Sequence, residues 1–415
     1  MNNKSIIFLA IVLGLLCGCS DDKQTKSAES KHDKAAEIQK VMRQAEEYAR
    51  QEKEKQQKLA DTEERPLIIG VVGPETGEEA QYGLSVMNGV LAAAKRFNAQ
   101  GGIDGKEIKV LHYNDESKIA YTEKIVSYLI KERAIAIISA PTGTSTFTPV
   151  HLVENSKTIF ISVGTRRHIE RSGKFIFRTA VPDETATEDL IKYATRELGY
   201  VNYALITSSV NEFSLSLSSM FKKALYKNDG VIKLETDVYD TYTGTLKIDL
   251  VIDAIRNSPD ELQGVVFTGG ASEGALLAQG LKKAGLTLPI IGGEELLSTD
   301  YLEGGDAVEG TLLYSTLSSD EKSSKMAEFI KDYGKAEPDR FAALAYDTFM
   351  LVADAIKIAG STNTSRVKEA LINRKECEGV TGKTSFSSDG APIKHPLICK
   401  IKRGKNGGPT VVLKQ

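Results

Sequence analysis

Apolar runs alternate with stretches of helical spacing along most of the chain. Residues 67–73 (LIIGVVG) are rich in β-branched side chains and precede a Gly-Pro turn, which is typical of a buried strand. Residues 79–98 then carry apolar side chains at helical intervals. The predicted strands are 67–73, 107–113, 134–139, 158–163, 203–207, 231–238, 264–269, 288–293, 310–315, 384–386, 397–402 and 409–413. The predicted helices are 79–98, 119–131, 145–156, 184–198, 213–227, 245–257, 272–284, 321–333 and 340–359.

This alternation predicts an α/β protein whose parallel sheets are covered by helices on both faces. The rhythm runs once up to residue 163 and restarts at 184, so we expect two similar lobes. In such sheets, ligands bind outside the carboxyl ends of the strands. The segments that follow those ends are rich in Gly, Ser and Thr, whose hydroxyls and backbone N–H groups can approach a ligand.

The first residues have the pattern of a signal peptide. Lys4 precedes an apolar run over residues 6–16, which is too short for a permanent membrane helix. The run ends in Leu16-Cys17-Gly18-Cys19, which resembles the bacterial lipobox, and polar sequence follows at once. We therefore expect residues 1–18 to be removed and Cys19 to be lipidated, against the alternatives of an ordinary signal or an uncleaved anchor. We expect the protein in a bacterial cell envelope, periplasmic or extracytoplasmic, with the inner and the outer membrane as alternative places of attachment.

Residues 19–65 read as a charged tether. Residues 35–58 are rich in helix formers, and the pairs Glu46/Arg50 and Glu54/Lys58 place the acid four residues before the base. The apolar stripe is thin, so a solvated helix is favoured over a coiled coil. Such a tether would hold the folded part away from the membrane.

Composition excludes several classes of function. The 415 residues carry a net charge of only −3, so no basic excess is available for a nucleic acid. The five histidines form no metal-ligand spacing, and we expect no metal or cofactor. If residues 1–18 are removed, Cys377 and Cys399 remain beside Cys19, and an oxidising compartment favours a disulfide between them over two buried free thiols.

Several motifs of residues 66–415 resemble the leucine/isoleucine/valine-binding family of periplasmic substrate-binding proteins. They are the opening GPETGEEAQYG (73–83), NGVLAAAKRFNAQGGIDGKEIKVLHYND (88–115), SVGT (162–165), LKKAGLTLPIIGGE (281–294), GTLLYST (310–316), FAALAYD (341–347) and VTGKTSFSSDG (380–390). The resemblance implies a type I fold with two lobes and three hinge crossings. It implies an N-terminal lobe of residues 66–183 plus 314–389 and a C-terminal lobe of residues 184–313 plus 390–415.

The resemblance also implies how a ligand is held. Two first-lobe loops, containing Gly143, Thr144 and Ser145 and then Gly164, Thr165 and Arg166, would bind its α-carboxylate. The carbonyl of Gly164 and the carboxylate of Glu294 would meet its α-ammonium, and Tyr82, Phe213 and Phe341 would enclose its side chain. A zwitterion that is removed from water needs a hydrogen-bonding or charged partner for each of its two charges, so this arrangement is chemically reasonable.

The chain departs from the family pattern at two of these positions. Gly143 stands where the family has a leading Ser, and Arg166 stands where it often has Thr. We therefore expect either a branched-chain amino acid or a related small amino-acid-like or carboxylate ligand. Each named side chain also has a purely structural alternative: Tyr82, Phe213 and Phe341 in core packing, and Glu294 in a surface ion pair.

The function expected from the resemblance is that of a binding protein and not of an enzyme. We expect a monomeric, membrane-anchored solute-binding lipoprotein of an ABC importer, which captures its ligand by closure of the lobes and delivers it to permease subunits with separate ATPases. No phosphate-binding GxxxxGK[ST] motif is present on this chain. The first alternative is a ligand sensor or cell-envelope regulator on the same fold.

A second alternative is a hydrolase. Residues 270–274 (GASEG) match the G-x-S-x-G pattern, with Ser272 as the nucleophile, Asp300 or Asp306 as the acid and His395 as the base. This alternative is disfavoured because His395 lies beside Pro396 and no HGGG motif precedes the serine.

Overall fold

The computed structural model describes residues 43, 47, 50–51, 67–164, 168–210, 212–240, 242–258, 261–317, 324–334, 338–404 and 409–413, with the backbone alone at 144, 145 and 409–413. The chain divides into two compact units, residues 1–64 and 65–415. In the first unit, the four described residues are helical and exposed, as predicted for the tether (Arg43, Glu47, Arg50 and Gln51). The predicted signal peptide and Cys19 lie outside the described residues. Within the described part of the chain, no helix has the length and apolar character needed to cross a bilayer.

The second unit contains a parallel sheet of five strands in the order β2-β1-β3-β4-β5. Its strands are β1 (Leu67–Gly73), β2 (Ile108–Asn114), β3 (Ala136–Ser139), β4 (Ile159–Ser162) and β5 (Ile176–Arg178). The surrounding helices are α3 (Ala80–Ala99), α4 (Ile119–Lys131), α5 (Thr144–Phe147), α6 (Val150–Ser156), α12 (Ser324–Tyr333), α13 (Arg340–Ala359) and α14 (Thr364–Asn373), with a 3₁₀ turn at Ile169–Ser172.

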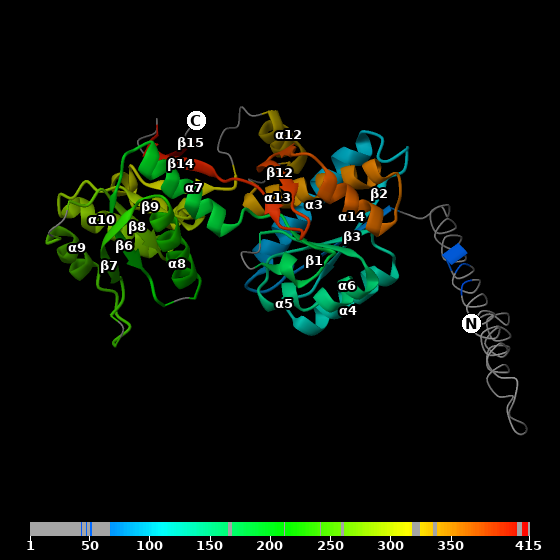
Figure 1. Cartoon of the computed structure of the whole chain (residues 1–415), viewed down its shortest axis with the longest axis horizontal. Helices are drawn as coiled ribbons and strands as arrows, with labels where there is room; N and C mark the ends of the chain where they lie inside the picture. Colours follow the sequence, from blue (N-terminus) through cyan, green and yellow to red (C-terminus); the bar gives the residue numbers. More distant parts are fainter. Residues whose placement is uncertain are drawn as a thin grey trace, which may run out of the picture. The chain divides into compact units, whose positions relative to one another are not determined.

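Alternating side chains of this sheet enter two separate cores. Ile68 and Val72 point toward α4 and α6, whereas Ile69 and Val71 point toward α3 and α13. Burial on both faces explains why the central strands β1, β3 and β4 are largely apolar runs, whereas the edge strand β2 is only partly buried. Figure 1 shows α4 and α6 together on one side of this sheet and α3, α13 and α14 on the other.

Helices α3 and α13 lie very close to each other. A Cβ atom on Gly89 of α3 would meet the carbonyl oxygen of Ala342 in α13 at 2.2 Å, so only glycine permits this approach. The contact packs the middle of α3 against the first turn of α13.

A second sheet of seven strands has the order β15-β14-β10-β9-β8-β6-β7. Its strands are β6 (Asn202–Thr207), β7 (Val231–Asp237), β8 (Gly264–Thr268), β9 (Ile290–Gly292), β10 (Leu312–Ser315), β14 (Leu397–Arg403) and β15 (Pro409–Leu413). Strand β14 runs antiparallel to β10 and β15, and the remaining neighbours are parallel.

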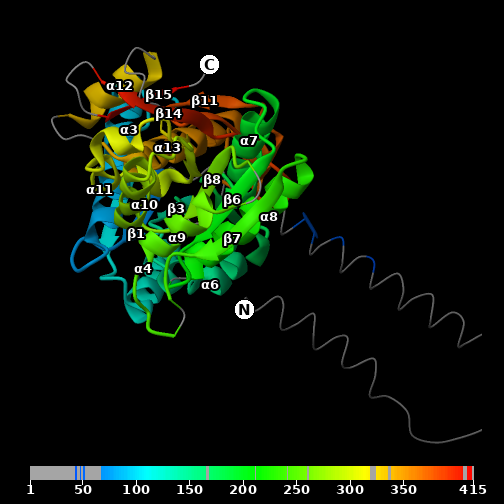
Figure 2. The same cartoon turned by 90° about the vertical axis from the view of Figure 1, so that its left-hand side faces the viewer.

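Helices also cover both faces of the second sheet. Figures 1 and 2 show α9 (Ile248–Arg256) and α10 (Ala271–Lys283) on one side, and α7 (Asp183–Arg196) and α8 (Glu212–Lys227) on the other. The remaining elements here are α11 (Thr299–Leu302) and 3₁₀ turns at Glu294–Leu297 and Gly305–Val308. The predicted α/β class with two helix-covered sheets is thereby confirmed; the first sheet is parallel, and the second is parallel except at β14 and β15.

Three segments connect the two sheets: β5 to α7, β10 to α12, and the third sheet to β14. This third sheet is small and antiparallel, with strands β11 (Cys377–Gly379), β12 (Gly382–Phe386) and β13 (Pro392–Ile393). The expected lobe boundary between residues 313 and 314 falls inside β10, which as a whole belongs to the second sheet.

Some elements differ from the sequence-based prediction. The predicted helix over 145–156 is two helices, because Pro149 starts α6 and ends any continuous helix before it. Strand β5 and helix α14 were not predicted. The predicted disulfide is wrong, because Cys377 and Cys399 are both free thiols. Cys377 lies in the small third sheet and Cys399 in the core of the second sheet, so burial in separate places keeps them apart.

Candidate functional site

Three of the predicted site residues meet at the carboxyl end of the first sheet. The rings of Tyr82, in the first turn of α3, and Phe341, in the first turn of α13, are in edge-to-face contact with centroids 5.1 Å apart. Gly164 lies two residues after the end of β4 and under the Phe341 ring. Tyr82 is 37% exposed, whereas Phe341 packs, partly buried, against the core of the first sheet, as its structural alternative requires.

Gly164 is required by both conformation and space. Its φ of +82° lies in the left-handed region, and a Cβ atom there would lie 2.7 Å from Cε1 of Phe341. The glycine therefore lets the aromatic ring lie directly on the backbone of the loop, next to Pro141 of the loop after β3.

We expect Gly164→Ala to destabilise the protein and to displace Phe341. The left-handed conformation alone costs about 1–2 kcal/mol for a residue with a Cβ atom, and the clash with the ring adds to this. The matched control is Gly199→Ala, since Gly199 has a φ of +73° and no atom near its would-be Cβ. Urea unfolding followed by circular dichroism should give a larger loss for Gly164→Ala than for Gly199→Ala; equal losses would contradict the role of ring contact.

Glu294 comes to the same end of the molecule from the second sheet. It opens the 3₁₀ turn that follows β9, and its side chain is 9% exposed. Its Oε1 accepts a hydrogen bond from the hydroxyl of Thr316, which follows β10. Its Oε2 lies 3.2 Å from Nη1 of Arg340, the first residue of α13.

The Arg340 guanidinium joins Glu294 to the aromatic pair. Its Cζ lies 4.8 Å from the centroid of the Phe341 ring, within cation–π range. Glu294 Oε2 is buried and has no hydrogen bond of good geometry among the described residues, although Arg340 supplies a nearby charge. The Glu294 carboxylate is thus paired with a positive charge, and its Oε2 can still accept a hydrogen bond.

A second ionic group is buried beside this one. Lys394, 3% exposed, donates to the hydroxyl of Thr381, which in turn donates to Asp347 of α13 at 2.5 Å. Burial lowers the pKa of Lys394 to about 8, and the nearby carboxylates of Asp347 and Glu294 act in the opposite direction. The connection between the third sheet and β14 therefore carries a cation that is held between two acidic groups.

The other predicted site residues are not brought into this group by any described contact. Phe213 packs, partly buried, against the core between α7, α8 and the second sheet, which favours its structural alternative. Gly143 is exposed with a φ of +58°, just before α5. The side chains of Thr144 and Ser145 and the whole of Thr165 and Arg166 lie outside the described residues, and their roles stay predictions.

Sequence reasoning missed Arg340, Thr316 and Lys394. Thr316 is the last residue of the quoted segment GTLLYST, and Arg340 directly precedes FAALAYD, so their positions were available. The signal in the sequence was an arginine directly before a singled-out aromatic, at the start of a helix. What the sequence could not supply was its pairing with Glu294, 46 residues earlier along the chain.

The alternative hydrolase site is not assembled. Ser272 Oγ lies 3.5 Å from Asp300 Oδ2, but His395 Nδ1 is 2.7 Å from Asp189 of α7. The only histidine that follows Ser272 in the sequence is therefore paired with another carboxylate.

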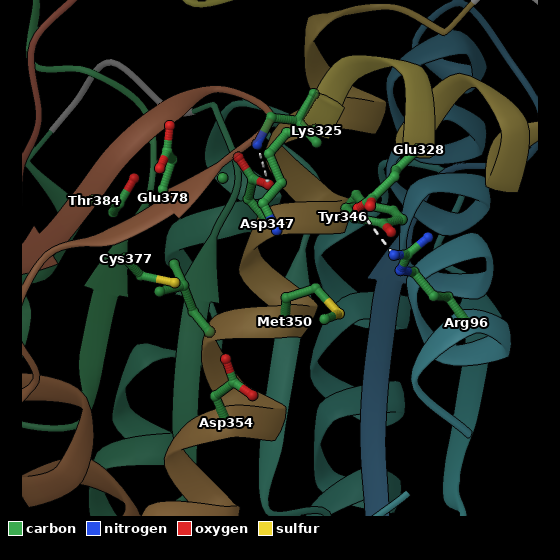
Figure 3. Close-up of a pocket in the computed structure, with 13 residues that line it drawn as sticks. Arg96, Lys325, Glu328, Tyr346, Asp347, Met350, Asp354, Cys377, Glu378 and Thr384 are labelled. Carbon is green, nitrogen blue, oxygen red and sulfur yellow. Dashed lines mark hydrogen bonds and ion pairs between the residues drawn. The ribbon is translucent and has the colours of Figure 1, made fainter. Parts of the chain in front are cut away.

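Two cavities lie away from the aromatic pair and Glu294, although Asp347 lines the first of them. One of about 100 Å³ is formed where α3, α12, α13 and the third sheet meet. Figure 3 shows Tyr346, Asp347, Met350 and Asp354 along α13, with Arg96 on one side and Cys377, Glu378 and Thr384 on the other. Another, of about 460 Å³, lies between α10 and the start of β9. Neither is lined by Tyr82, Gly164, Glu294 or Phe341.

The fold and this group of residues define a class of protein. Two helix-covered parallel sheets, joined by three crossings, with functional side chains at their carboxyl ends, are the features of a binding protein with two lobes. The chain belongs to the periplasmic binding protein family, whose sequence model matches residues 66–406. This confirms the family resemblance of the sequence motifs.

Known proteins of this family are similar to this chain along most of their length. The Leu/Ile/Val-binding protein homolog 3 of Brucella melitensis is 27% identical over 333 residues, which cover 78% of this chain and 88% of the relative. The substrate-binding protein of a branched-chain amino acid transporter from Streptococcus pneumoniae, solved with isoleucine, superposes with a TM-score of 0.62 at 24% identity and covers 84% of this chain and 100% of its own. A solute-binding protein of Rhodopseudomonas palustris, solved with 3,4-dihydroxybenzoic acid, gives 0.66 at 19%, covering 84% and 96%. These structures confirm the two-lobe type I fold.

Proposed function

We propose that this substrate-binding protein captures a small amino-acid-like or carboxylate ligand between its two lobes and presents it to an ABC importer. One observation carries the proposal: Glu294 from the second sheet and the Tyr82–Gly164–Phe341 group from the first sheet converge on Arg340. The name of the Brucella melitensis relative supports an amino-acid-like ligand. The fold alone does not choose the ligand, because structures of the same fold hold isoleucine in one case and an aromatic acid in another.

Closure of the lobes is the proposed mechanism. The first lobe comprises residues 66–183 plus 316–389 and the second 184–315 plus 390–415, because β10 as a whole belongs to the second sheet. The ligand binds first to the aromatic pair and the loops after β3 and β4. The second lobe then closes by hinge motion over the three crossings, and closure is favoured because Glu294 reaches the ligand only in the closed form.

The proposal also includes the location of the protein in the cell. Removal of residues 1–18 and lipidation of Cys19 would anchor the protein to a membrane, with its folded part outside the cytoplasm. Residues 19–65 would serve as a spacer. Two or three acyl chains give stable attachment. The proposed partners are permease subunits with separate ATPases, which recognise the closed, ligand-loaded monomer.

Ligand capture is tested by screening amino acids and organic acids for a rise in melting temperature of the purified chain. A compound that binds should lose about 3–5 kcal/mol of affinity in Glu294→Ala if the carboxylate is the buried partner of a ligand ammonium. Isothermal titration calorimetry measures that loss. The control is Glu303→Ala, which removes an exposed carboxylate close by in the sequence and should leave affinity unchanged. A screen without any stabilising compound would contradict capture, and unchanged affinity in Glu294→Ala would contradict its role.

A further inference from the structure

A histidine at the first crossing between the two sheets faces a carboxylate with each of its ring nitrogens. His168 directly precedes the 3₁₀ turn at Ile169–Ser172 and is partly buried. Its Nδ1 lies 2.9 Å from Oε1 of Glu170, and its Nε2 lies 3.0 Å from Oε1 of Glu184. Glu170 belongs to the same 3₁₀ turn, and Glu184 belongs to the first turn of α7, which packs on the second sheet. The imidazole therefore connects the two lobes beside the segment that joins them.

The geometry of these two contacts requires the charged form of the ring. Both contacts have the length of an N–H···O hydrogen bond, and an ionised carboxylate can only accept such a bond. Each ring nitrogen must therefore carry a proton. A neutral imidazole has one N–H group and one acceptor nitrogen, whereas the imidazolium has two N–H groups. Only the imidazolium form of His168 can donate to Glu170 and Glu184 at the same time.

The charges around His168 lead to the same protonation state. Arg178, at the end of β5, is fully buried and donates to Glu170 from Nε and Nη2, and its Nη2 also lies 3.3 Å from Nδ1 of His168. Arg178 and the imidazolium supply two positive charges, and Glu170 and Glu184 supply two negative charges, so these four side chains sum to zero. A neutral ring that accepted from Arg178 would bring an unprotonated Nδ1 within 2.9 Å of Glu170 Oε1, where two lone pairs repel.

Resting on the hinge motion of the proposed function, we infer that protonation of His168 fixes the first crossing between the lobes and that loss of the proton releases it. The protonated ring joins the 3₁₀ turn of the first lobe to the first turn of α7 in the second. When the ring loses a proton, the contact with the exposed Glu184 separates, because Glu170 is held in place by Arg178. Histidine side chains change charge between about pH 5 and 8, so the pH outside the cytoplasm would control how freely the hinge moves.

The other histidine at a crossing has no such requirement. His395, in the third crossing, is exposed, and its described contact is one carboxylate, Asp189 of α7, at 2.7 Å from Nδ1. A neutral imidazole with its proton on Nδ1 can donate this bond. The pH sensitivity therefore belongs to His168 and the first crossing.

Nitrogen-15 NMR of the full chain, labelled at its histidines, measures the charge of the ring directly. The His168 signals are assigned by their disappearance in His168→Gln. In a titration between about pH 9 and about pH 5, which covers the range in which histidines titrate, both ring nitrogens should carry protons at the acidic end. One of them should lose its proton toward the basic end. A ring whose charge stays the same over the whole range would overturn the inference.

Hydrogen exchange followed by mass spectrometry measures the release of the crossing. After correction for the intrinsic effect of pH on exchange, the amides of residues 179–188 should exchange roughly 10- to 100-fold more slowly with the charged ring than with the neutral ring, the range for a hydrogen bond to a charged group. His168→Gln should exchange at the faster rate at every pH. Glu184→Gln, which changes an exposed side chain, should lose most of the pH dependence.

The matched control is His151→Gln, which changes an exposed histidine of α6 and should keep the pH dependence of the natural protein. Melting curves confirm that each variant is folded. Exchange that does not depend on pH, or an unchanged pH dependence in His168→Gln, would overturn the inference and leave ligand capture standing. None of these measurements uses a ligand, so a ligand screen without a stabilising compound would contradict ligand capture alone.

Discussion

Replacing Glu170 by alanine is expected to lower the free energy of unfolding by about 3–5 kcal/mol, the range for breaking a buried ion pair. Glu170 is 1% exposed, and Arg178, at the end of β5, is 0% exposed. The guanidinium donates from Nε to Oε2 at 3.1 Å and from Nη2 to Oε1 at 3.3 Å. Removal of the carboxylate takes away the acceptor of two hydrogen bonds from a buried guanidinium, and this desolvation cost is the source of the loss.

His168 extends this buried pair to the surface. Its Nδ1 lies 2.9 Å from Glu170 Oε1, and its Nε2 lies 3.0 Å from Oε1 of Glu184. Although partial burial raises the pKa of Glu184, its hydrogen bond with His168 and the nearby charges of His168 and Arg178 lower it overall. The group links the 3₁₀ turn after β4 to the first turn of α7, at the first crossing between the sheets.

Two comparisons test this prediction by urea unfolding. Asp253→Ala breaks the exposed pair with Arg256 and should cost at most about 1 kcal/mol. The double variant Glu170→Leu with Arg178→Met replaces the pair by apolar side chains and should recover most of the loss, because neither charge then remains buried. A double variant as unstable as Glu170→Ala would show that the cost comes from lost packing.

Asp347→Ala is expected to destabilise the protein by about 3–5 kcal/mol as well. Its carboxylate accepts from the backbone N–H groups of Val380 and Thr381, each at 2.8 Å, and from the Thr381 hydroxyl. All of these donors are buried, and α13 and the third sheet are joined through them. Removal of the carboxylate leaves two backbone donors unsatisfied and Lys394 without its nearest acidic group.

Lys394→Met is the partner variant for this prediction. When Asp347→Ala is made in the Lys394→Met variant, it should lower the free energy of unfolding by less than it does in the natural protein, because no buried cation then loses its acidic neighbour. Equal losses would contradict the coupling.

Lys394 also makes the free energy of unfolding depend on pH. Its pKa is about 8 in the folded protein, against 10.5 for an ordinary lysine side chain in water. The unfolded chain therefore holds more protons between these values, so stability should rise with pH from about 8 to 10.5. Lys394→Met should abolish this rise.

The fold was predictable because its strands are buried on both faces. Continuous apolar runs such as those at 67–73 and 264–269 mark such strands, and the helical spacing between them marks the crossovers. Strand β5 was missed because only three residues form it, and α14 because its apolar positions are few. Local sequence patterns of this kind predict the fold class and the order of the long strands and helices, but they do not reveal every short element.

The site was predictable only in part, for a different reason. Tyr82, Gly164, Glu294 and Phe341 were identified from family motifs, and three of them are in contact. Arg340 escaped because its importance rests on a partner brought close by the fold and not on its own neighbours in sequence. The cysteines show the same limit: two thiols in an oxidising compartment suggest a bond, but only the fold separates them into different sheets.

The interleaved connectivity of the two sheets has a consequence for how the polypeptide acquires its structure during synthesis. Strand β10 needs β14 as its partner, yet 81 residues lie between Ser315 and Leu397 and contribute α12, α13 and α14 to the first sheet. A chain that emerges from its amino end can therefore complete neither half until nearly all of it has been made. Both halves then mature together, and a truncated product lacking the last strands would expose the edge of β10 to intermolecular pairing.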